Sequence, residues 1–116
     1  MPAASFVATA WNNGAWNRTG AGYGLKISVE DRDKFFERDW STVMLRLIGN
    51  RTRRIAEANV AKRSFWDATC RELINVEIGR WFIENGFDRW TQGSPPRFRM
   101  RPVTRREFEV RLDHRR

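Results

Sequence analysis

The residue types best suited to contact another molecule lie in two polar loops, of which the first joins two predicted strands. It carries five such residues: Asn12, Asn13, Trp16, Asn17 and Arg18. An asparagine amide can pair with an adenine edge, an arginine guanidinium with a guanine edge, and a tryptophan can stack on a base. The alternative is a hairpin loop whose asparagines adopt turn conformations and whose tryptophan folds back on the core. Because Trp16 has no apolar neighbour beyond Ala15, we favour the contact role slightly.

The second loop, residues 59–66, combines polar residues with two aromatic ones. The residue types able to make contacts are Asn59, Lys62, Arg63 and Ser64. We expect Lys62 and Arg63 to contact phosphate groups. Phe65 and Trp66 are expected to anchor the loop in the core, because large aromatic side chains dominate core packing.

Three further cations belong to the candidate site. Lys26, together with Arg18, supplies the positive charge of residues 11–29, which hold no acidic residue. Arg51 and Arg53 stand beside a Gly-Asn turn between two predicted strands. These two arginines fit a binding surface and an exposed hairpin tip without a partner about equally well.

Positive charge is concentrated outside the predicted helices. The chain of 116 residues has a formal net charge of +8. Residues 46–63 hold six basic residues and one acidic residue, whereas residues 30–40 and 64–94 each hold five acidic and three basic residues. Most of the cations are arginines, whose planar guanidinium pairs bidentately with phosphate and with guanine. This distribution predicts a polyanionic partner, because a rigid scaffold commonly displays its binding residues on loops.

The chain offers few groups for catalysis or metal binding. Its single histidine, His114, lies near the C-terminus, and with the single cysteine, Cys70, it cannot complete a zinc site. Acidic residues within 30–39 leave a metal-dependent nuclease as a minor alternative, although Asp31 and Asp33 lack the spacing that such sites use. We therefore expect no enzyme activity, no cofactor, no metal and no small-molecule substrate.

Six strands and two helices are predicted to hold the two loops in place. The predicted strands are 5–11, 23–27, 42–48, 53–60, 98–103 and 107–112, and the predicted helices are about 29–38 and 69–85. Ser28 and Asp31 have the spacing of a capping box at the start of the first helix. Thr69 and Glu72 have the same spacing at the start of the second, which Gly86 closes.

The order of these elements predicts an α+β fold. A mostly antiparallel sheet of about six to seven strands should curl into an open barrel, with two helices beside it. A single domain is expected over residues 1–112, and residues 113–116 are expected to form a frayed tail. No secretion signal and no apolar run of membrane-spanning length is present, so we expect a cytoplasmic protein, or a nuclear one in a eukaryote, without a membrane partner.

The layout resembles the DNA-binding pseudobarrel shared by plant B-three-type transcription-factor domains and the effector domains of some restriction endonucleases. The segments that carry the resemblance are Tyr23-Gly24-Leu25-Lys26-Ile27, Phe35-Phe36, Phe65-Trp66, Trp81-Phe82-Ile83-Glu84-Asn85-Gly86, Phe98 and Phe108. The resemblance implies two arms, residues 12–18 and 59–64, that grip the major groove like a wrench. The chain departs from the plant pattern in its longer second helix and in residues 90–96, which replace a glycine-acid turn.

Together these observations predict a non-catalytic module that binds double-stranded DNA, with most contacts to phosphate and a few to bases. Two alternatives remain open. The chain could bind structured RNA, or it could be an interaction or inhibitor protein that binds an acidic protein partner, since exposed tryptophan and arginine also dominate protein interfaces. A phosphate binder is distinguished by a steep loss of affinity with rising salt.

Overall fold

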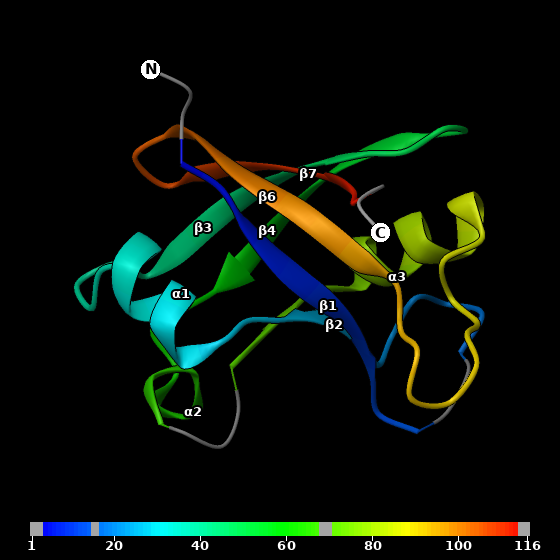
Figure 1. Cartoon of the computed structure of the whole chain (residues 1–116), viewed down its shortest axis with the longest axis horizontal. Coiled ribbons are helices and arrows are strands. Elements are labelled where there is room, and N and C mark those ends of the chain that lie inside the picture. Colours follow the sequence, from blue (N-terminus) through cyan, green and yellow to red (C-terminus); the bar gives the residue numbers. More distant parts are fainter. Residues whose placement is uncertain (1–3, 15–16, 68–70, 114–116) are drawn as a thin grey trace.

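Within the part of the chain that the structure describes, seven strands form a single sheet that curls into a nearly closed barrel (Figure 1). The computed structural model of the chain describes residues 4–14, 17–67 and 71–113. Its elements are β1 (Phe6–Asn12), β2 (Tyr23–Lys26), α1 (Val29–Phe35), β3 (Thr42–Ile48), β4 (Arg53–Asn59), α2 (Arg63–Trp66), β5 (Glu72–Ile74), α3 (Val76–Asn85), β6 (Arg97–Thr104) and β7 (Glu107–Leu112). The predicted α+β fold with an open, mostly antiparallel barrel is confirmed.

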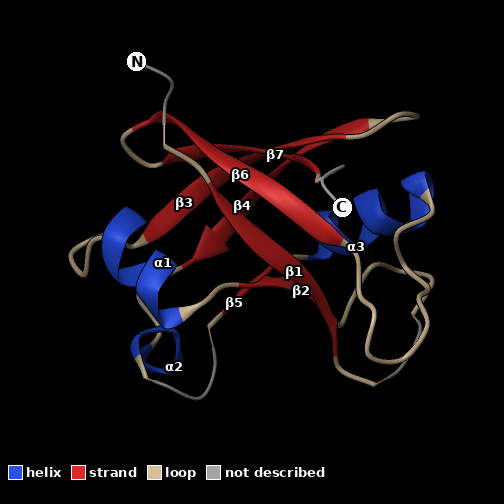
Figure 2. Cartoon of the chain, in the orientation of Figure 1, coloured by secondary structure: helices blue, strands red, loops and turns tan. Residues whose placement is uncertain are grey.

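The strand order across the sheet is β4-β3-β7-β6-β1-β2-β5. Strands β3 and β7 run parallel, and every other neighbouring pair is antiparallel. The two edge strands, β4 and β5, contact each other, and α3 packs along β4. Figure 2 shows α1 and α2 at one end of the barrel and α3 at the other. None of these helices, the three in the described residues, is long and apolar enough to cross a membrane.

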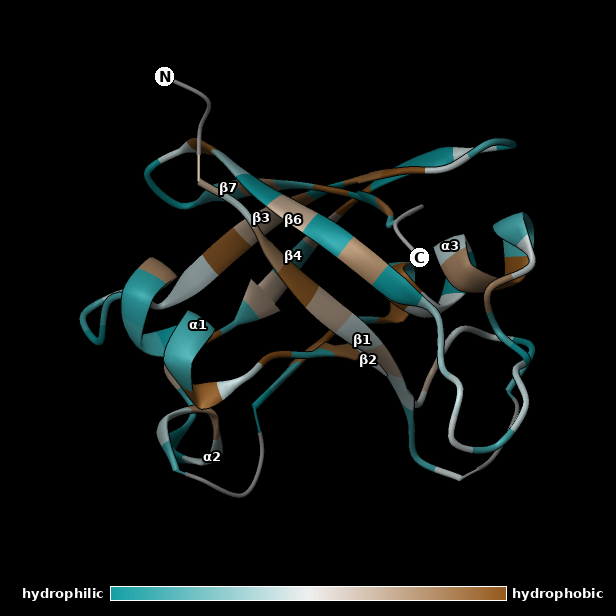
Figure 3. Ribbon diagram, in the orientation of Figure 1, coloured by the Kyte–Doolittle hydropathy of each residue, from teal (hydrophilic) through white to brown (hydrophobic). Residues whose placement is uncertain are grey.

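Alternation of apolar and polar residues places one face of each strand inside the barrel. The inward side chains of β1 and β6 are Phe6, Ala8, Ala10, Phe98 and Met100, all of them buried. Figure 3 shows this as a change between hydrophobic and hydrophilic segments along both strands. Aromatic rings fill the interior, with Phe36 stacked on Phe108 at 5.0 Å and Phe82 on Phe98 at 5.3 Å between centroids. Such a core follows from the period-two pattern of the strands.

Helix α1 begins as its sequence predicts but ends early. The Ser28 hydroxyl accepts a hydrogen bond from the Asp31 backbone N–H at 3.1 Å, which confirms the predicted capping pair. The helix was expected to continue to about residue 38, yet it ends at Phe35. Phe36 is extended, with φ −122° and ψ 148°, and its ring is buried against Phe108. Burial of this ring outweighs the helical propensity of the residues that follow.

The second predicted helix begins later than the sequence suggested. Glu72, expected in its first turn, instead begins β5, which pairs antiparallel with β2, while Thr69 lies outside the described residues. The helix cap is Asn75, whose Oδ1 accepts a hydrogen bond from the Glu77 N–H at 2.8 Å. Pairing with β2 accounts for the strand, because it satisfies backbone groups that a first helical turn would leave open. Gly86 ends α3 in the left-handed conformation, as predicted.

Two shorter segments also differ from the sequence prediction. Residues 63–66, expected within a loop, form the single turn of α2, a third helix. Asp113, expected in the frayed tail, extends the β6–β7 pairing: its backbone N–H bonds to the Arg97 carbonyl at 2.8 Å. Its side chain lies 3.5 Å from Arg99. Residues 114–116 of the predicted tail lie outside the described residues.

Candidate nucleic-acid interface

The β1–β2 loop starts with two asparagines that shape its backbone. Asn12 ends β1 opposite Tyr23, and its Oδ1 accepts a hydrogen bond from the Gly14 N–H at 2.9 Å. The Asn13 N–H bonds to the Gly22 carbonyl at 2.9 Å and so closes the base of the loop. Asn12 therefore serves as a turn former, while its side-chain amide N–H groups are not needed for the turn.

The far side of this loop is seated on α3. A Cβ on Gly79 of α3 would overlap the Gly20 carbonyl, so the two backbones touch. The Arg80 guanidinium also bonds to the Thr19 carbonyl at 3.3 Å. Because α3 supports the loop at Thr19 and Gly20, the exposed side chains of Asn17 and Arg18 project from a supported position.

Arg18 stands over a small pocket between the loop and the end of α3. The pocket has a volume of about 310 Å³, and its lining residues are Asn17, Arg18, Tyr23, Ile83, Asp88 and Arg89. Burial and the nearby Asp88 carboxylate raise the pKa of Tyr23, so its hydroxyl stays protonated at neutral pH. The Arg18 guanidinium makes no ion pair with the described residues. Trp16, the predicted stacking residue of this loop, lies outside them.

The second predicted loop contains four polar residues of the candidate site. Lys62, Arg63 and Ser64 belong to α2 or its cap, and Asn59 ends β4 before it. The Asn59 Oδ1 accepts a hydrogen bond from the Ala61 N–H at 2.8 Å, which turns the chain after β4. Lys62 is the cap residue of α2, but its side chain makes no capping bond. Arg63 is exposed at the first position of the helix, and Ser64 is half-buried behind it. With respect to the described residues, the side chains of Lys62 and Arg63 are unpaired.

Aromatic residues anchor this loop, as the sequence predicted. Phe65 is fully buried and meets Phe36 edge-on at 5.3 Å. Trp66 is half-buried against it, and its indole N–H bonds to the Val60 carbonyl at 2.9 Å. The guanidiniums of Arg32 and Arg38 lie over the Trp66 ring at 5.2 and 4.9 Å.

Arg32 is a structural residue that sequence reasoning missed. It is only 6% exposed and donates to the carbonyls of Phe65 and Asp67 at 3.1 and 3.2 Å. A salt bridge of 2.9 Å to Asp33 supplies the counter-charge. Its position on α1, four residues before the buried Phe36, is the only sequence signal that it faces inward.

The two loops lie at opposite ends of β2, on the same side of the sheet in the view of Figure 1. The β1–β2 loop leads into β2 after Gly22. The loop that contains α2 is held by Arg32 of α1, and α1 follows β2 in the chain. A further link lies beside α2, where the Arg71 guanidinium donates to the Ile27 carbonyl at 2.8 Å. From Gly22 to Ser28 the extended chain spans about 20 Å. Lys26 is exposed between them, opposite Thr9 and Glu72 in neighbouring strands.

Arg51 and Arg53 are not brought together with these loops. Arg53 begins β4, whereas Asn59 ends it, so the hairpin arginines lie a full strand away from α2. The Arg51 backbone N–H bonds to the Asn85 side chain at 2.8 Å, and both arginine side chains are exposed. Their neighbour Arg54 is held by Glu77 and Glu84, each at 2.5 Å.

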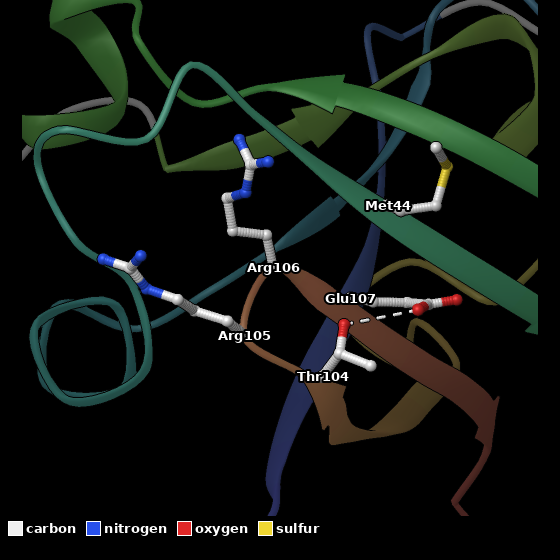
Figure 4. A pocket seen from close by; sticks show the side chains of 5 residues that line it. All are labelled: Met44, Thr104, Arg105, Arg106 and Glu107. Carbon is white, nitrogen blue, oxygen red and sulfur yellow. Dashed lines mark hydrogen bonds between the residues drawn. The ribbon is translucent and has the colours of Figure 1, made fainter.

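A wider pocket lies at the turn between β6 and β7 (Figure 4). Its volume is about 600 Å³, and its lining residues are Met44, Thr104, Arg105, Arg106 and Glu107. Glu107 forms a salt bridge with Arg46 and accepts a hydrogen bond from the Thr104 hydroxyl. Arg105 forms an ion pair with Glu37 at 3.5 Å. The lining of this pocket therefore contains one carboxylate, which is already bound by other side chains. A pair of groups for acid–base chemistry is not found among these lining residues.

The acidic residues of α1 also have structural partners. Asp31 accepts a 3.0 Å hydrogen bond from the Ser28 hydroxyl, and Asp33 pairs with Arg32. Across the described ranges, 4–14, 17–67 and 71–113, no group of three histidine, cysteine or acidic residues is placed to hold a metal ion. Cys70 and His114 lie outside those ranges.

Comparison with known proteins gives no support to the resemblance to the DNA-binding pseudobarrel, which is based only on the layout of elements and loops. No protein-family model matches the chain, and no curated protein or solved structure is significantly similar to it. The candidate interface is accordingly defined by geometry alone: two supported loops, each with an exposed arginine, at the two ends of one short strand.

Proposed function

We propose that the chain is a non-catalytic module that binds double-stranded DNA in the cytoplasm, or in the nucleus of a eukaryote. Its two arms are the β1–β2 loop, residues 13–22, and the α2 arm, residues 60–67. The observation that carries the proposal is the placement of exposed cations on both arms, each arm fixed to the barrel by its own contacts. Arg18 is exposed on one arm and Arg63 on the other, where the neighbouring Lys62 is half-buried.

The separation of the arms favours duplex DNA over duplex RNA. The major groove of B-DNA is about 12 Å wide and admits protein elements, whereas the major groove of A-form RNA is deep and narrow. Arms that lie at the two ends of an extended segment about 20 Å long can straddle one groove and reach the phosphates on both sides. Asn17 is exposed next to Arg18 and offers an amide to base edges.

Two variants with equal loss of charge test the proposal. R18A/R63A removes one exposed arginine from each arm, and R51A/R53A removes two exposed arginines from the distant hairpin. Fluorescence polarisation with a randomised duplex would compare them with the unmodified chain at several salt concentrations. We expect R18A/R63A to weaken binding about tenfold or more and to lower the salt slope by about two, because each arginine would neutralise one phosphate. R51A/R53A should weaken binding less than about threefold.

The same assay separates the alternatives. Equal losses in the two variants would show that net charge, and not the arms, drives binding. Tighter binding to duplex RNA than to duplex DNA would favour the structured-RNA alternative. Absence of binding to any nucleic acid at low salt would rule the proposal out and direct attention to an acidic protein partner.

A further inference from the structure

The surface between the two arms is formed by the outward faces of β1, β2 and β5. The strand register aligns Trp11 with Gly24 and Gly24 with Ile74, so these three residues form one row across the sheet. The next row, towards α2, consists of Thr9, Lys26 and Glu72. The first row is therefore apolar and the second is polar.

The two side chains of the apolar row reach the surface to different degrees. Ile74 is 39% exposed, and Trp11 is half-buried on the outer face of β1. In the described part of the chain, the partly buried apolar side chains that pack against the core do not include Trp11 or Ile74. Two adjacent apolar side chains at the surface form a contiguous patch, the kind of surface that marks a contact with another molecule.

Gly24 makes the row continuous. A Cβ at this position would lie 3.4 Å from Cε3 of Trp11 and 3.1 Å from Cγ1 of Ile74, so these two side chains come together over the buried backbone of Gly24. The result is a shallow apolar strip with Trp11 on one side and Ile74 on the other.

We propose that this strip, Trp11-Gly24-Ile74, contacts the C5-methyl groups of pyrimidines in the major groove, those of thymine and 5-methylcytosine. The inference rests on the proposed binding of duplex DNA and names the feature of the duplex that the floor between the arms recognises. The major-groove edge of thymine carries a methyl group, and apolar side chains are the partners that such methyl groups select. The occupant is DNA because the exposed charges next to the strip are positive: Lys26 lies in the adjacent row, whose Glu72 is buried, and Arg18 extends from the arm that follows β1.

Three randomised duplex pools with the same backbone test this inference. One pool contains uracil in place of thymine, one contains the natural bases, and one contains thymine with 5-methylcytosine in place of cytosine. The pools differ in the number of methyl groups in the major groove, while their phosphate charge is constant. We expect affinity to rise from the first pool to the third, by about fourfold for each methyl group buried.

Two matched isoleucine variants assign the effect to the strip. I74S removes the exposed isoleucine beside Gly24, and I55S removes a still more exposed isoleucine, 66% exposed, from β4. I74S should bind the three pools with nearly equal affinity, whereas I55S should keep the rise seen with the unmodified chain. Circular dichroism would confirm that both variants are folded, and the comparison of pools with the unmodified chain does not depend on them.

The possible outcomes are distinct. Equal affinity of the unmodified chain for the three pools would overturn the methyl inference and leave duplex binding intact. A rise that persists in I74S would overturn the assignment to this strip. Absence of binding to all three pools would overturn both the inference and the proposed function.

Discussion

The Arg32 guanidinium donates a 3.1 Å hydrogen bond to the carbonyl of Phe65, a residue 33 positions further along the chain. This contact joins α1, which follows β2, to the α2 arm, which follows β4. Because Arg32 also donates to the Asp67 carbonyl, one side chain holds the C-terminal end of the short helix. A helix of a single turn has little stability of its own, so contacts such as these determine its position.

Replacing Arg32 by alanine should therefore destabilise the protein. The substitution leaves two carbonyls of the α2 arm without their donor, and we expect the free energy of unfolding to fall by about 1–3 kcal/mol in urea titrations. R38A is the matched control, because Arg38 is exposed and its only contact in the described residues is the Trp66 ring. That variant should lose about 1 kcal/mol or less. Equal losses would contradict a special role for Arg32.

The start of α3 shows why helix boundaries are hard to predict from this sequence. Thr69 and Glu72 match the spacing of a capping box, and the apolar residues after them fit a helical period. The structure places Glu72 in β5, because the free edge of β2 offers a partner that local spacing cannot reveal. Asn75, the true cap, is a stronger capping residue than threonine, but it lacks the acidic residue three positions on that makes Thr69 match a capping box.

Asn75 should contribute in two separable ways. Its Oδ1 caps α3, and its amide donates to the Glu57 carbonyl at 2.7 Å, which links α3 to the edge strand β4. We expect N75A to lower the free energy of unfolding by about 2 kcal/mol, and N75D, which keeps the capping oxygen, by about 1 kcal/mol. Thermal unfolding of both variants would check the order. A loss in N75D as large as that in N75A would show that the cap contributes little.

The ion pairs on α3 predict a loss of stability in acid. Hydrogen bonds from Arg54 and Thr52 lower the pKa of Glu84 to about 2, and those from Arg54 and Arg80 lower the pKa of Glu77. A folded-state pKa below the unfolded value means that these groups stabilise the protein at neutral pH. Their contribution is lost as the pH falls from about 5 towards 2. Urea titrations across this pH range should show the decline.

The variant E84Q isolates one of these groups. It removes the titrating carboxylate that faces Arg54, so its stability should fall less steeply between about pH 5 and pH 2 than that of the unmodified chain. At neutral pH the loss should be about 1 kcal/mol, since the pair is partly exposed. E30Q serves as control, because Glu30 is exposed and makes no ion pair with the described residues. A pH profile of E84Q identical to that of E30Q would exclude Glu84 as a source of the acid sensitivity.

The sequence could predict which residue types form the candidate interface, but not which of these residues lie near one another in the fold. The sequence identified both loops, because turn formers and unpaired cations are local features. It also identified Phe65 and Trp66 as anchors, since large aromatic residues beside a polar loop rarely stay exposed. It could not separate Arg51 and Arg53 from the arms, because only the pairing of β3 with β4 puts them at the far end of that hairpin. The exposed strip of Trp11 and Ile74 was missed for the same reason, as it depends on the register of three strands.

The contact between Gly20 and Gly79 should control the position of the β1–β2 arm. Replacing glycine by alanine within an exposed helix stabilises it by about 0.5–1 kcal/mol, but here the new Cβ would overlap the Gly20 carbonyl. Overpacking of this kind costs about 1–3 kcal/mol, so we expect G79A to be destabilised and its β1–β2 arm to be displaced. DNA affinity should fall as well, although the substitution alters no charge. R80A, which removes the hydrogen bond to Thr19 without a steric overlap, should lose less stability. If G79A proved more stable than the unmodified chain and bound duplex DNA equally well, the arm would not depend on this contact, and its support would have to come from the Asn13–Gly22 pairing at its base.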